Sequence, residues 1–128
     1  MADAVAGGYE LNLPLRIVRG TGEPPAPLVR VDGDAAVTVE SVKPADDRSG
    51  DVAVRLYEAH GGRGAATVRA SFPVASAQVT DLLERPTGPT GLAGAVGPTG
   101  PVALDGDGRV PVRPRPFQMP TLRITPCA

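Results

Sequence analysis

Three side chains able to do chemistry lie close together in the segment VRLYEAHGGRG, residues 54–64. They are the carboxylate of Glu58, the guanidinium of Arg63 and the imidazole of His60, which is the only histidine in the chain. Side chains two positions apart in an extended strand project to the same side, so Glu58 and His60 can touch. Such a group could act as a general acid, a metal ligand or a clamp for an anion.

The surrounding residues favour a turn over a reaction centre. A catalytic zinc usually has three protein ligands, and the chain offers no second histidine and only one cysteine. The tripeptide His60-Gly61-Gly62 resembles an oxyanion loop in its letters, but no nucleophile elbow accompanies it. We therefore predict that the two glycines supply positive φ angles to a hairpin turn. We assign no catalytic, cofactor-binding or metal-binding residue.

Two acidic groups invite a second chemical interpretation. Asp46-Asp47 and Asp105-Gly106-Asp107 carry carboxylate oxygens, which are the ligands that calcium takes in proteins. Neither group has the glutamate at the twelfth position that an EF-hand loop requires. We predict polar turns at both places.

Charge and composition exclude other classes of function. The chain has 13 basic and 14 acidic residues, for a net charge of −1, so no basic face for nucleic acid is expected. No apolar run approaches the roughly 20 residues that cross a membrane. The start, MADAVAGGYELN, lacks the basic and apolar regions of a secretory signal, and Cys127 has no partner for a disulfide. We expect a cytoplasmic protein with no membrane and no nucleic-acid partner.

The elements that must position these side chains are short strands. The 16 glycines and 15 prolines among 128 residues leave little room for helices, and apolar residues alternate with polar ones in most segments. The sequence predicts one all-β domain over 1–128, an antiparallel β-sandwich of seven to nine short strands with an unstructured start at 1–7. We place strands at 9–17, 28–32, 36–43, 52–60, 65–72, about 77–83, 102–112 (as a hairpin) and 117–125, with Phe72 and Phe117 in the core.

A repeat interrupts this pattern near the C-terminus. Glycine recurs at 88, 91, 94, 97 and 100, which is the spacing of a collagen triple helix. One interpretation is a trimerisation stalk. The other, which we favour, is a loop inserted at 86–101, because long insertions cost little closure entropy.

A carbohydrate-binding module is a competing class of function. Such modules stack sugars on exposed aromatic rings, and this chain has only two tyrosines and two phenylalanines. Arg55 and Tyr57 share one face of a strand, so a weak polar sugar contact there stays open.

Four segments in order carry a resemblance to a known family. They are YELNLPLR (9–16), VTVESVKPADDRSGDVAVRLYEAHGGRG (37–64), TDLLERP (80–86) and RPFQMPTLRI (115–124). Together they resemble the C-terminal β-sandwich of bacterial glycoside hydrolase family 38 α-mannosidases. The likeness covers nearly the whole chain, while the glycine repeat looks like an insertion outside the family pattern.

The resemblance implies a non-catalytic domain of a larger enzyme. The family hydrolyses α-mannosidic bonds with retention, using a carboxylate nucleophile and a zinc ion in an upstream catalytic domain, so we expect no cofactor in this chain. The implied partners are the catalytic and other domains of the parent polypeptide, and a weak mannoside contact is left open. Whether Arg55, Tyr57, Glu58 or His60 approaches substrate is left open.

Overall fold

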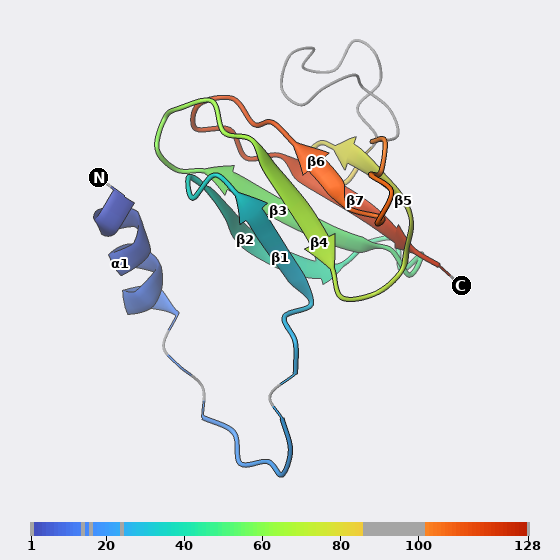
Figure 1. Ribbon diagram of the computed structural model, residues 1–128, viewed down its shortest axis with the longest axis horizontal. Coiled ribbons are helices and arrows are strands. Elements are labelled where there is room, and N and C mark those ends of the chain that lie inside the picture. Colours follow the sequence, from blue (N-terminus) through green and yellow to red (C-terminus); the bar gives the residue numbers. More distant parts are fainter. Residues whose placement is uncertain (1, 14, 16, 24, 86–101, 128) are drawn as a thin grey trace.

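The computed structural model describes residues 2–13, 15, 17–23, 25–85 and 102–127. In this part of the chain, seven strands with alternating apolar residues form two antiparallel sheets. The first sheet has three strands in the order β1-β4-β6, and the second has four in the order β2-β3-β7-β5. The two sheets lie face to face as the layers of a sandwich (Figure 1). In chain order the strands are β1 (Val29–Gly33), β2 (Val37–Pro44), β3 (Val52–Glu58), β4 (Ala66–Ala70), β5 (Val74–Thr80), β6 (Val110–Val112) and β7 (Thr121–Pro126).

The core lies between the layers, where the apolar phase of each strand points inward. The register pairs Val54 of β3 with Leu122 of β7, and Leu122 with Val79 of β5, so one apolar row crosses three strands. The opposite layer contributes Val68 and Val110, which are paired with each other. Val54, Val68 and Leu122 are fully buried. The predicted β-sandwich and the inward phase of β3 and β4 are confirmed.

The predicted strand at 9–17 is wrong. Ala2–Asn12 form helix α1, which lies outside the two layers (Figure 1) and includes residues 2–7, where an unstructured start was predicted. Alternation makes a strand only where a neighbouring strand pairs with it and a core covers one face. Here Leu11, Leu15 and Ile17 are 83%, 98% and 96% exposed, and α1 reaches the sandwich through a hydrogen bond from the Tyr9 hydroxyl to Glu40 of β2.

Three further expectations need correction. The strand placed at 77–83 ends at Thr80, because the Asp81 carboxylate accepts the backbone N–H groups of Leu83 and Arg85, each at 2.9 Å, and turns the chain. Only the second arm of the 102–112 hairpin is a strand, since the N–H of Val102 donates instead to Ala77 of β5. Phe117 is 60% exposed and lies outside the core, whereas Phe72 packs against the core. The glycine repeat lies outside the described residues.

The core predicts a clear stability difference. Leu56→Ala should lower the free energy of unfolding by about 2–5 kcal/mol, because Leu56 is fully buried and its truncation leaves a cavity. The matched control Leu15→Ala should change it by less than about 0.5 kcal/mol, since Leu15 is 98% exposed. Urea unfolding followed by circular dichroism measures both, and equal effects would contradict the assignment of the core.

Candidate functional site

Two connections between the layers meet at one end of the sandwich. Residues 59–65 lead from β3 in the four-stranded sheet to β4 in the three-stranded sheet, and residues 113–120 lead back from β6 to β7. They run side by side at the end where β3 finishes (Figure 1). Two backbone hydrogen bonds, both 2.9 Å, run from the N–H of Leu56 to Pro120 and from the N–H of Glu58 to Gln118. They extend the pairing of β3 to the residues that precede β7. The predicted hairpin between β3 and β4 is therefore wrong, because these strands belong to different sheets.

The carboxylate of Glu58 joins the two connections. Its side chain is fully buried. Oε1 accepts the backbone N–H groups of His60 at 3.1 Å and Gly62 at 3.2 Å, and Oε2 accepts those of Gly61 at 2.9 Å and Phe117 at 2.8 Å. Two hydrogen bonds to each oxygen use the acceptor capacity of the carboxylate. Glu58 therefore has a structural role and is not free to ligate a metal or move a proton.

The same contacts keep this carboxylate ionised. Burial by itself raises the pKa of Glu58. The N–H groups of Phe117, His60, Gly62 and Gly61 together lower this pKa by more than burial raises it, so the pKa lies below its ordinary value. Hydrogen bonds to the charged form favour that form. No arginine or lysine among the described residues forms an ion pair with Glu58. Backbone dipoles alone stabilise its charge.

Gly61 is the residue that this arrangement requires to be small. Its φ is +76°, which glycine adopts without strain. A Cβ at this position would lie 2.5 Å from Cζ of the Phe117 ring. Gly62 is not among the residues with positive φ, so one of the two glycines fills the role predicted for both.

The residues left open by the sequence separate into two places. His60 and Arg63 are exposed at the Glu58 end, and the only contact between His60 and Glu58 is made by the His60 backbone N–H. Arg55 and Tyr57 lie in the four-stranded sheet, where the Arg55 guanidinium donates to the Leu82 carbonyl at 3.1 Å. The structure does not bring these four side chains into one site.

Both acidic groups considered for calcium serve the fold. Asp46 pairs with Lys43 at 2.6 Å, and Asp47 pairs with Arg123 at 2.6 Å. Asp105 accepts the N–H of Arg109 at 2.9 Å and closes the turn that precedes β6. Within the described ranges, no three His, Cys, Asp or Glu side chains come together as a metal site.

Two ion clusters that sequence reasoning missed lie at the 44–51 turn. The Lys43 ammonium contacts Glu84, a 5% exposed residue whose other oxygen accepts the N–H of Asp46 at 2.8 Å. Arg123 contacts Asp51 at 2.5 Å and Asp47, and hydrogen bonds from Arg123 and then Ser49 lower the pKa of Asp47 to about 2. Each cluster joins segments distant in sequence, so spacing along the chain carried no signal for it.

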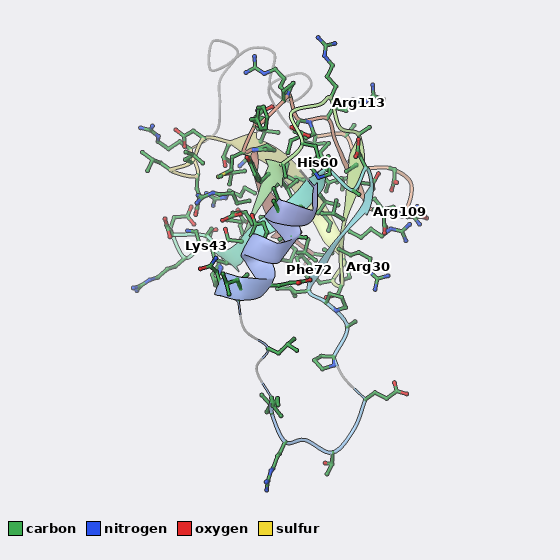
Figure 2. The ribbon with its side chains drawn as sticks, turned by 90° about the vertical axis from the view of Figure 1, so that its left-hand side faces the viewer. Arg30, Lys43, His60, Phe72, Arg109 and Arg113 are labelled. Carbon is green, nitrogen blue, oxygen red and sulfur yellow. The ribbon has the colours of Figure 1, made fainter. Side chains whose placement is uncertain are left out.

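A hollow lined by three arginines lies at the end of the sandwich where the two connections meet at Glu58. It has a volume of about 540 Å³ and is lined by Arg63, Gly64, Arg113, Pro114, Arg115 and Pro116. All three arginines are exposed. In the view of Figure 2, Arg113 and His60 both lie in the upper part of the molecule. We call this hollow the arginine pocket.

No helix among the described residues is long and apolar enough to span a bilayer.

Comparison with known proteins gives two matches. The family model for the Glycosyl hydrolases family 38 C-terminal beta sandwich domain matches residues 36–122, which include both connections that meet at Glu58. The sequence is similar to Alpha-mannosidase 2C1 of Homo sapiens, with 35% identity over 89 residues, covering 66% of this chain and 9% of that protein. The chain thus spans a small part of the length of this relative.

The buried carboxylate predicts a specific loss of stability. Glu58→Gln should lower the free energy of unfolding by about 2–4 kcal/mol, because a carboxamide nitrogen cannot accept hydrogen bonds and leaves buried N–H groups without an acceptor. Glu23→Gln, at an exposed position, should have an effect within about 0.5 kcal/mol of zero. Urea unfolding at pH 7 gives both values. Equal midpoints for Glu58→Gln and the wild type would show that the four hydrogen bonds do not form.

Proposed function

Because this chain belongs to the family of glycosyl hydrolases family 38 C-terminal beta sandwich domains, we propose that it is the supporting β-sandwich of a cytoplasmic α-mannosidase. In this role it packs against the catalytic part of the parent polypeptide and helps to shape the substrate cleft. The observation that carries the proposal is the family match over 36–122, which spans strands of both sheets. In the cytoplasm the exposed thiol of Cys127 stays reduced.

The chemistry of the described residues supports a non-catalytic role. Retaining glycoside hydrolysis needs two carboxyl groups, one on either side of the scissile bond. The oxygens of the buried Glu58 accept four backbone N–H groups, and those of Glu84 bind Lys43 and the N–H of Asp46. Neither carboxylate is free to act on a substrate. Zinc, which the resemblance implies for a catalytic part, does not fit the donor set here. His60 stands alone as an imidazole, and the described carboxylates gather in no group of three metal-binding side chains.

A carbohydrate-binding module is the second candidate, and one observation favours it. Phe117 is 60% exposed, and exposed aromatic residues are the surface on which sugars stack. Slowed migration of the chain in gels containing yeast mannan, abolished by Phe117→Ala, would favour this second function. Unchanged migration would favour the supporting role.

The supporting role can be tested in a relative. Three forms of Alpha-mannosidase 2C1 are compared: the intact protein, a form cut before the region matched by this chain, and the cut form fused to this 128-residue chain. We expect the cut form to be poorly soluble, because it exposes the apolar surface that the sandwich covers. The fusion should recover soluble protein and hydrolysis of p-nitrophenyl α-mannoside.

The fusion carrying Leu56→Ala provides the control for a folded sandwich, and it should recover less activity than the wild-type fusion. If the cut form were as soluble and active as the intact enzyme, the supporting role would be refuted.

A further inference from the structure

The arginine pocket brings together three arginines that have no carboxylate partner among the described residues. Arg63 comes from the 59–65 connection, and Arg113 and Arg115 come from the 113–120 connection. None of the three forms an ion pair with any described residue, whereas Lys43, Arg69, Arg85, Arg109 and Arg123 do. Arg19, Arg30, Arg48 and Arg55 are also without an ion pair, but they do not line the pocket. Three arginines without an ion-pair partner among the described residues therefore line one hollow.

The chain contains little that could neutralise the pocket from within. The segment 86–101 has no acidic residue. Glu58, at the same end, is buried with four N–H donors on its oxygens. Asp34, near Gly64, uses one oxygen to accept the N–H of Ala36 at 2.9 Å and pairs with none of the three arginines. No described carboxylate forms an ion pair with an arginine of the pocket.

The backbone around the pocket is held in place before any partner arrives. Pro114 is almost fully buried. A Cβ at Gly64 would lie 2.8 Å from Cγ2 of Val37, so the backbone packs closely there. Glu58 ties the two connections together through hydrogen bonds to both. A preorganised backbone reduces the entropy lost when a ligand binds.

We propose that the arginine pocket docks an acidic segment of the parent polypeptide, in which at least two Asp or Glu side chains bind Arg63, Arg113 and Arg115. Guanidinium groups bind carboxylates through pairs of parallel hydrogen bonds. Pro116, which is exposed beside Arg115, offers apolar surface to the stem of a peptide side chain. The proposal rests on the supporting role, and the relative's length shows that such a polypeptide can be long, since this chain spans 9% of it.

Binding of a defined acidic peptide to the 128-residue chain tests the chemistry of the pocket. The probe is a fluorescein-labelled peptide of eight glutamates, titrated by fluorescence anisotropy at low salt. The pocket variant is Arg63→Gln, Arg113→Gln and Arg115→Gln combined. The control variant combines Arg19→Gln, Arg30→Gln and Arg48→Gln, which removes the same charge at exposed positions outside the pocket. Figure 2 shows Arg30 far from Arg113.

The pocket variant should weaken peptide binding about tenfold, from three charged contacts of modest strength each, while the control variant should change it less than about twofold. Equal weakening in the two variants would mean a general charge effect and would overturn the proposal. Tighter binding of inorganic phosphate than of the peptide would also overturn it, in favour of a phosphate site.

The fusion to the truncated Alpha-mannosidase 2C1 separates this proposal from the supporting role. If the wild-type fusion recovers activity and the pocket variant does not, while the control variant does, the docking contact is established. If the wild-type and pocket-variant fusions recover equally, the docking contact is refuted and the supporting role stands. If the wild-type fusion fails, the supporting role fails with it, and the peptide titration still reports whether the pocket binds carboxylates.

Discussion

Four backbone N–H groups donate hydrogen bonds to one buried carboxylate and fix one end of this sandwich. At this end the chain crosses from the four-stranded sheet to the three-stranded sheet and later crosses back. Three of the donors follow Glu58 directly in the sequence, and the fourth belongs to Phe117, 59 residues later. An ionised carboxylate buried without such donors would cost several kcal/mol. The interaction therefore works in both directions: the loops must adopt this conformation for Glu58 to be buried, and the buried Glu58 holds the loops in it. Glu58 therefore has a structural role, although the sequence around it suggests a reactive group.

The two ends of the molecule differ in how their charges are compensated. At the 44–51 turn, Lys43 and Arg123 meet Asp46, Glu84, Asp47 and Asp51 within the same chain. Around Glu58 the negative charge is stabilised by backbone N–H groups, and the nearby Arg63, Arg113 and Arg115 form no ion pair with a carboxylate in the part of the chain that the structure describes. A surface of this kind suits a domain that is held against another part of a polypeptide, because arginine is the preferred partner for carboxylates at interfaces.

The sequence could predict what depends on local pattern. Val54, Leu56 and Val68 alternate with polar residues, and the period of two fixes both strand and face; the ordered motifs also carried the resemblance that the family match confirms. The same period at 9–17 misled, because whether an alternating segment finds a partner strand is decided by the rest of the fold. The glycines after Glu58 hinted at a turn. The Phe117 N–H and the convergence of Arg63 with Arg113 could not be predicted, since they depend on two connections that meet only in three dimensions.

A pH titration of the backbone amides by NMR tests the central role of Glu58 most directly. The amide resonances of His60, Gly61, Gly62 and Phe117 should shift together with one midpoint, below the ordinary glutamate pKa of 4.5, because all four N–H groups donate to one ionised carboxylate that is stabilised in the folded state. In Glu58→Gln that common titration should vanish. Four independent midpoints, or a common midpoint at or above 4.5, would contradict the account.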